Sequence, residues 1–390
     1  MRSPRALLDA KIGLWLCALG SACSEVYGTP IVDVVAGRGG ALSTTGGVAD
    51  ANGGLPNAGS SSGGSDAGNT ANANGGTSAR GGSGSGGASD PIASCPNSLL
   101  GFASVGEPAT GGLLGKTVRA TDADELKKFA TDPAPLTIEI ATSISLDEQI
   151  RPTSNKTLIG VDASGALIGG GLYILGVKNI IVRNLSISMV GKDIGDAIGI
   201  QSSEHVWIDH CDFYSNLTDP KGTYDGLVDI THGSDYVTVS WNDFHDHYNA
   251  SLISHSEAAA DEDVGHLKVT LHHNWFHRLL GYAPRARFGQ VHIFNNFYQD
   301  VDATAVISES NADVYVESNA FNRVLSPLVT HYEDALDGKA VAVDNVRVDS
   351  GVPMIGAPST WLPSSAYAYR TDLPDSVPSL VSKCAGVGNL

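Results

Sequence analysis

Positive charge is scarce in this chain of 390 residues, which has 24 Lys and Arg against 42 Asp and Glu and a formal net charge of −18. This balance argues against a nucleic-acid partner, because binding to a phosphate backbone depends on clustered Lys and Arg.

Long apolar runs are also lacking. The run at 12–19 is shorter than the roughly 20 residues that a membrane helix needs, and no later run reaches that length.

The N-terminal residues 1–22 have the pattern of an export signal. Basic residues precede the apolar run at 12–19, and small residues then precede Cys23. Two interpretations of Cys23 remain open. It is either lipidated after cleavage, which would anchor the chain to a membrane only through that lipid, or an ordinary residue beside a conventional cleavage site. Both predict an exported protein, secreted or held at the cell surface.

Residues 23–94 are expected to form a disordered linker. From about residue 35 they consist largely of Gly, Ser, Ala, Asn and Thr, which cannot bury enough apolar surface to offset the entropy of ordering. A coil of this length spans roughly 45 Å. It is a tether if Cys23 is lipidated and a simple spacer otherwise.

The folded domain is predicted at 95–390, with few cysteines. Cys95 and Cys384 lie near its two ends and Cys211 in its middle. In an exported protein, a disulfide between Cys95 and Cys384 would join the two ends. The alternative is that all three cysteines are unpaired thiols.

A short β-rich template recurs within this domain. Each copy ends in an aromatic residue that lies two positions after a shared slot. Asn fills this slot in four copies and Cys211 in the first. The copies are 206–213, 237–244, 269–276, 291–298 and 314–321, with Asn242, Asn274, Asn296 and Asn319 in the slot and Phe213, Phe244, Phe276, Tyr298 and Phe321 at the end.

Most successive Asn are 22 or 23 residues apart, which is typical of a solenoid. Short Val- and Ile-rich strands without a Leu framework favour a parallel β-helix over a leucine-rich repeat. The longer interval between Asn242 and Asn274 predicts an inserted loop at about 254–266, and such loops often build a functional site. Residues 121–130 form the one clear helical pattern, which we expect to cap the N-terminal end of the solenoid.

Four stretches in order carry a specific resemblance. They are 155–187, 195–213, 225–247 and 283–298, and together they make the region from about 98 to 325 similar to the pectate lyase family. The resemblance implies an all-β, right-handed, single-stranded parallel β-helix. It also implies calcium-dependent β-elimination of polygalacturonate, the acidic plant cell-wall polysaccharide, in pectin degradation. We expect a monomer, with this polymer as its partner.

Carboxylates suited to calcium are present. β-Elimination removes the C5 proton of a uronate, and a hard cation with oxygen ligands acidifies that proton by neutralising the neighbouring carboxylate. Asp225 and Asp229 are four residues apart, and Asp196 lies about one coil earlier. By resemblance these three match the family's calcium ligands, while Asp193 is a fourth candidate with a less usual spacing. The alternative is that these residues only solvate turns.

Arg285 and Arg287 flank Ala286, so in a strand their side chains would point the same way. Two guanidinium groups there could bind uronate carboxylates and supply positive potential in an acidic domain. The alternative is that they pair with nearby acids of the chain.

Two positions depart from the family. Tyr282 stands where the family has an Arg regarded as the proton-abstracting base, and Asn249 stands where a substrate-binding Lys is common. Tyr282 could itself be the base, with a pKa lowered by Arg and Ca²⁺. Arg285, or a cation brought in by a loop, could take that role instead. A third hypothesis is a protein that binds the polymer with little or no cleavage. Arg287 and Asn249 are expected to bind substrate.

Other activities fit less well. A hydrolase on this fold needs paired Asp residues, and the strand repeats hold no adjacent pair. A pectin lyase would have lost the calcium carboxylates. Asp209 and His210 lack a nucleophilic Ser, so His210 is expected to be a hydrogen-bonded structural residue. A zinc site is not expected among four further histidines, whose spacing gives no closed ligand set: His245, His247, His272 and His273.

Overall fold

A computed structural model describes residues 95–390 of the chain. The predictions for the signal at 1–22, for Cys23 and for the linker at 23–94 lie outside the described residues. Within 95–390, no helix is both long and apolar enough to cross a bilayer.

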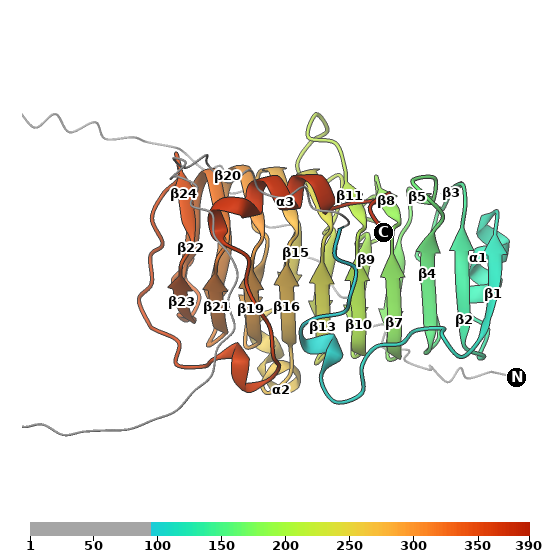
Figure 1. The fold of residues 1–390 in the computed structure, drawn as a ribbon, viewed down its shortest axis with the longest axis horizontal. Helices are drawn as coiled ribbons and strands as arrows, with labels where there is room; N and C mark the ends of the chain where they lie inside the picture. Colours follow the sequence, from blue (N-terminus) through green and yellow to red (C-terminus); the bar gives the residue numbers. More distant parts are fainter. Residues whose placement is uncertain (1–94) are drawn as a thin grey trace, which may run out of the picture. The chain divides into compact units, whose positions relative to one another are not determined.

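The described residues wind into a parallel β-helix, and all pairings between named strands are parallel (Figure 1). One sheet has ten strands in the order β1 (Lys116–Ala120), β2 (Leu136–Ile140), β4 (Lys156–Gly160), β7 (Lys178–Arg183), β10 (Glu204–Asp209), β13 (Asp235–Ser240), β16 (Lys268–His272), β19 (Gln290–Phe294), β21 (Asp313–Glu317) and β23 (Lys339–Val343).

The remaining strands form two ladders that the long strand β20 (Phe297–Glu309) joins. The first ladder contains β3 (Ser143–Ser145), β5 (Ala166–Ile168), β8 (Ser186–Ser188), β11 (Asp212–Tyr214), β14 (Asp243–His247) and β17 (Trp275–Leu279). The second contains β6 (Leu172–Leu175), β9 (Ile198–Gln201), β12 (Val228–Thr231), β15 (Ser251–Ile253) and β18 (Arg285–Arg287). Beyond β20 lie β22 (Ala320–Val329) and β24 (Val346–Val348).

Helices are few. They are η1 (Phe102–Ser104), α1 (Ala123–Ala130), η2 (Glu257–Ala259), α2 (Ala260–Asp263), η3 (Pro363–Ser365), η4 (Pro374–Ser376) and α3 (Val377–Cys384). The α1 helix begins after Asp122, whose carboxylate accepts the Glu125 N–H, and it buries Leu126 and Ala130 against the first coil. The predicted parallel β-helix with a capping helix is thereby confirmed.

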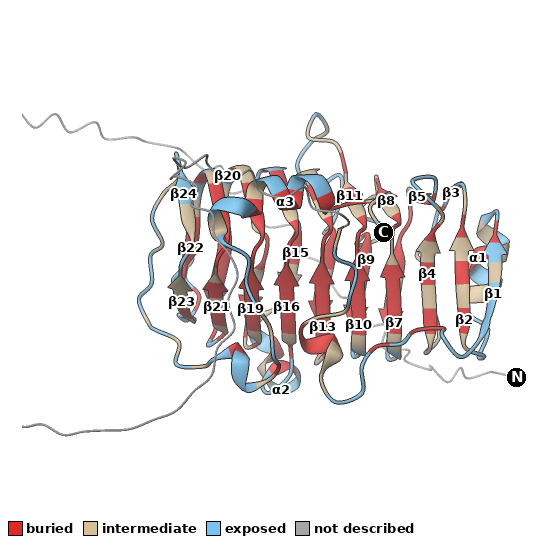
Figure 2. Cartoon of the chain, viewed as in Figure 1, coloured by how far each residue is buried: buried red, intermediate tan, exposed pale blue. Residues whose placement is uncertain are grey.

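The strands that carry the repeated template are largely buried (Figure 2). The slot residues and aromatic residues of the template lie in the interior of the coils. Its terminal aromatic rings stack one above another, with neighbouring centroids 4.8–5.0 Å apart from Phe213 to Phe321. The slot residues form a ladder in which each Asn Nδ2 donates to the Oδ1 of the next at 2.9–3.1 Å. The ladder continues to Asn345, which the template missed because Arg347 replaces the aromatic residue. Each buried amide is satisfied by its neighbours, so the repeat fixes the register of the coils.

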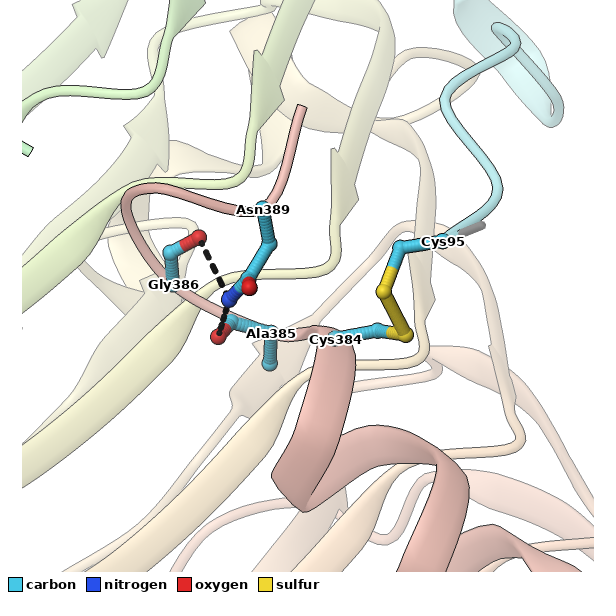
Figure 3. Close-up of a disulfide and its surroundings, with 5 residues drawn as sticks. All are labelled: Cys95, Cys384, Ala385, Gly386 and Asn389. Carbon is cyan, nitrogen blue, oxygen red and sulfur yellow. Dashed lines mark hydrogen bonds between the residues drawn. A yellow bond between two sulfur atoms is a disulfide. The ribbon is translucent and has the colours of Figure 1, made fainter. Parts of the chain in front are cut away.

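A disulfide joins the two ends of the domain, so the first of the two interpretations of the cysteines holds. Cys95 is bonded to Cys384 at the end of α3, across a sequence separation of 289 (Figure 3). Cys211 is free and buried.

We expect the double variant Cys95→Ser, Cys384→Ser to lose about 2–5 kcal/mol of unfolding free energy, because the bond constrains the unfolded chain. Chemical denaturation of both proteins measures the loss. Reductant should destabilise the wild type alone. A double variant as stable as the oxidised wild type would contradict this role.

Buried histidines predict acid sensitivity. Burial lowers the pKa of both His272 and His273, whose Nδ1 atoms are 2.9 Å apart and so share one proton. A histidine with a lowered pKa takes up a proton more readily in the unfolded chain than in the fold. The fold therefore keeps its full stability at pH above the ordinary pKa of about 6.5 and loses stability as the pH falls from there through the lowered pKa. With calcium present, the melting temperature should fall by at least about 3 °C between about pH 7.5 and pH 5. A constant or rising melting temperature would contradict it.

Candidate active site

A cavity of about 270 Å³ lies where loops meet the starts of β12, β15 and β18. A neighbouring cavity of about 250 Å³ shares three of its lining residues, Lys221, Asn249 and Tyr282. Asp225 and Asp229 line the first cavity, and Arg285 lines the second. Three successive coils therefore bring most of the sequence-predicted residues to one place. The inserted loop at 254–266 does not line either cavity.

Asp196 and Asp229 face each other across a glycine. Asp196 Oδ1 accepts the Gly226 N–H at 3.0 Å, and Asp229 Oδ1 accepts the Leu252 N–H at 3.0 Å. A Cβ atom at Gly226 would lie 2.6 Å from Asp229 Oδ1 and 2.8 Å from Asp196 Oδ1. Glycine is therefore required for this approach, and it leaves a small space between the two carboxylates.

The electrostatics of this pair call for a cation. Burial, followed by the Asp225 charge, raises the pKa of Asp196 to about 7. Burial and then the Asp196 charge raise the pKa of Asp229 well above its ordinary value. No Lys or Arg of the described chain forms an ion pair with either residue. An all-oxygen donor set without a basic partner fits a hard cation such as Ca²⁺, whose charge would favour the ionised carboxylates.

The third predicted ligand is less closely placed. Asp225 is exposed. The ligand atoms of Asp196, Asp225 and Asp229 do not all lie within 4.8 Å of one another, whereas those of two other clusters in 95–390 do. An exposed carboxylate can reach a cation by side-chain rotation. Asp193 borders a different hollow, with Asp147 and Arg151 among its neighbours, so the structure does not bring this fourth candidate into the cavity.

Tyr282 lies between the two cavities and is partly buried. Burial, followed by the Asp229 charge, raises the pKa of its phenol to about 12, although Arg285 and Arg287 oppose the rise. Without a metal, the direction is opposite to the predicted lowering, because desolvation and a carboxylate outweigh the two guanidinium groups.

The paired arginines are held by a buried acid that the sequence did not reveal. Arg285 Nε donates to Glu309 Oε1 at 2.7 Å and its Nη2 donates to Oε2 at 3.1 Å. Arg287 Nε lies 2.7 Å from Glu309 Oε1, without the alignment of a hydrogen bond, while its Nη1 donates to the Ser254 carbonyl. The Arg285 and Arg287 side chains are 15% and 9% exposed, and of the two only Arg285 borders either of these two cavities. Both arginines therefore pair with an acid of the chain, as the alternative interpretation expected. Substrate binding by these arginines remains a prediction.

Two lysines complete the cavity. Lys192 and Lys221 are exposed residues of the loops before Asp196 and Asp225, and Lys221 borders both cavities beside Asn249. Sequence reasoning missed them because neither belongs to a family-like motif. Their only signal was a position four residues before each of two expected calcium ligands.

The expected structural role of His210 is confirmed. It is fully buried, and its Nδ1 lies 2.7 Å from Asp209, which also pairs with Arg183. His245 contacts Asp212 and Asp246, and His247 lies against Ser215 and the Asp225 carbonyl.

The fold defines a parallel β-helix protein, and the cavity on its side is lined by carboxylates, lysines and a tyrosine. The pectate lyase family model matches residues 62–390. The chain is 40% identical over 276 residues to pectate lyase plyB of Emericella nidulans, covering 71% of this chain and 82% of that one. It is 41% identical over 259 residues to pectate lyase A of Aspergillus niger, covering 66% and 79%. The chain belongs to the pectate lyase family.

Solved structures agree with this assignment. Pectate lyase Bsp165PelA of Bacillus sp. N165, solved in complex with trigalacturonate, superimposes with a TM-score of 0.68 at 28% identity. The match covers 75% of this chain and 99% of that one.

Proposed function

We propose that this chain is a secreted, calcium-dependent pectate lyase that cleaves polygalacturonate by β-elimination. The observation that carries the proposal is the pair Asp196 and Asp229, which face each other across Gly226 beside Tyr282. Family membership and the trigalacturonate bound to a structural neighbour support the substrate class. The disulfide and the curated fungal relatives support an extracellular location.

Each group has a role in this mechanism. Asp196, Asp225 and Asp229 would hold Ca²⁺, which when bound supplies charge neutralisation for a uronate carboxylate. Asn249 and Lys221 would orient that carboxylate, and Arg285 would add positive potential from its Glu309 anchor.

Tyr282 would accept the C5 proton at its phenolate oxygen. The C5–H electron pair becomes the C4=C5 double bond, and the C4–O bond breaks with its electrons on the leaving oxygen. That oxygen takes up a proton from solvent as the rest of the polymer is released. Tyr282 is better suited to this than Arg285. Burial lowers the pKa of Arg285, but Glu309 favours its protonated form and the net effect is a raised pKa.

A non-catalytic or very slow binder is the second candidate, favoured by Tyr282 and Asn249 at positions where the family has cations. The purified full chain, incubated with polygalacturonate, distinguishes the two. Ultraviolet absorbance of unsaturated product supports the lyase. Retention on the polymer without absorbance would indicate a binder, and reducing ends without absorbance would indicate a hydrolase.

Lys221 should set affinity more than rate. Lys221→Ala is expected to raise KM for polygalacturonate about tenfold with little change in kcat, because it removes one charged contact to the polymer. Lys116→Ala in β1, far along the solenoid, is the matched control and should leave KM unchanged. Equal KM values for the Lys221 variant and the control would contradict this role.

A further inference from the structure

A cluster unlike the aspartate site lies on the inserted loop. His232, His255 and Glu262 each offer one ligand atom, and these atoms all lie within 4.8 Å of one another. His232 follows β12, while His255 and Glu262 lie on the insertion between β15 and β16. His232 Nδ1 lies 3.0 Å from Glu262 Oε2, and the rings of His232 and His255 stack at 4.2 Å.

We propose that this cluster binds a zinc-type transition-metal ion that fastens the insertion to the adjacent coil. Two imidazoles and one carboxylate are the protein ligands of many open zinc sites, with water in the fourth position. The aspartate cluster offers only oxygen ligands and suits Ca²⁺ instead. The chain would therefore hold two metals of different chemistry.

A buried acid beside the cluster supports a cation there. Asp263 is fully buried, and its Oδ1 accepts the Gly233 N–H at 2.7 Å. Its Oδ2 has no hydrogen-bond partner among the described residues. Asp263 directly follows Glu262, and its other oxygen, Oδ1, holds it against the residue that follows His232. The described residues therefore leave one buried oxygen atom of Asp263 without a partner next to the cluster.

The cluster can adjust to the ion. The His232 and Glu262 side chains are 34% and 43% exposed, and His255 is also exposed. The stacked rings must turn to point their nitrogens at one ion, which exposed side chains can do. His232 is three residues beyond Asp229, or about 10 Å along the strand, so the two sites are separate.

The second cluster in 95–390 does not have this freedom. It consists of Asp212, Asp243 and His245. His245 already contacts Asp212 at 3.1 Å and Asp246 on its other nitrogen, and Asp243 accepts from His277 at 2.8 Å. The ligand atoms there are already satisfied by protein partners, so we place the ion at His232.

The test is a calorimetric titration of the full chain with Zn²⁺ in saturating Ca²⁺. The wild type should bind one Zn²⁺, and both His255→Ala and Glu262→Gln should weaken binding at least about tenfold, since each removes one of three ligands. His331→Ala is the matched control, because His331 is an exposed histidine paired with Asp337 at 2.7 Å without a second imidazole. It should bind Zn²⁺ like the wild type.

Melting curves show whether each variant is folded. Without Zn²⁺, all four proteins should melt at the same temperature, and excess Zn²⁺ should raise the melting temperature of the wild type and His331→Ala only. Absence of Zn²⁺ binding to the wild type, or equal binding by His255→Ala, would overturn the proposal. Neither result bears on the lyase reaction, which uses other residues.

Discussion

Asp229→Asn should lower kcat/KM on polygalacturonate at least about a hundredfold at a fixed calcium concentration. Loss of a group that merely orients a metal ligand already costs about 10–100-fold, and Asp229 is proposed as a direct ligand. The loss should shrink as calcium is raised, because the remaining carboxylates still bind the ion weakly. Initial rates across a calcium titration measure both effects.

Stability separates this effect from misfolding. Asp229 has a raised pKa in the protein without metal, so its charged form destabilises the fold at neutral pH. Asn removes that charge, and in chelator the variant should therefore melt no lower than the wild type. Asp375→Asn, an exposed acid of η4, is the control and should keep full activity. A variant of Asp229 with wild-type rates at low calcium would remove this residue from the metal site.

Tyr282→Phe should lower kcat by about 10²–10⁴-fold with little change in KM, because loss of a general base affects the transition state and leaves substrate binding intact. The wild-type rate should rise with pH on the alkaline side, since the phenol pKa of about 12 without metal leaves most of the tyrosine protonated at neutral pH. Kinetics of both proteins across this range test the assignment.

The control for this substitution is Tyr315→Phe in β21, which lines neither cavity. It should keep the wild-type rate and pH profile. A Tyr282→Phe variant with an unchanged kcat would exclude tyrosine as the base and leave the role to a cation of the cavity.

The coils were predictable because their interior is periodic. The template of Asn242 and Phe244 recurs in sequence, and each copy stacks on the next in space. The helix at 123–130 was predictable from its cap and its early acids. Asn345 was not predicted as a member of the ladder, because the last coil keeps the amide but lacks the aromatic residue that defined the template.

The site was predictable only in part, because its residues come from turns that have no period. The motifs indicated Asp196 and Asp229, which the structure brings together, but they could not place the exposed Asp225 as closely. Glu309 was missed because its partners Arg285 and Arg287 lie one coil away, at a separation that sequence spacing alone does not pair. Burial of Tyr282 could not be read from the sequence either, and it reverses the expected direction of its pKa in the protein without metal.

The central claim is tested most directly by adding calcium back to the chelator-treated full chain in the presence of polygalacturonate. We predict that unsaturated product, followed by its ultraviolet absorbance, forms only after calcium is added and at a rate that saturates with calcium. Product formation at the same rate in chelator, or polymer binding without any product at saturating calcium, would contradict a calcium-dependent lyase.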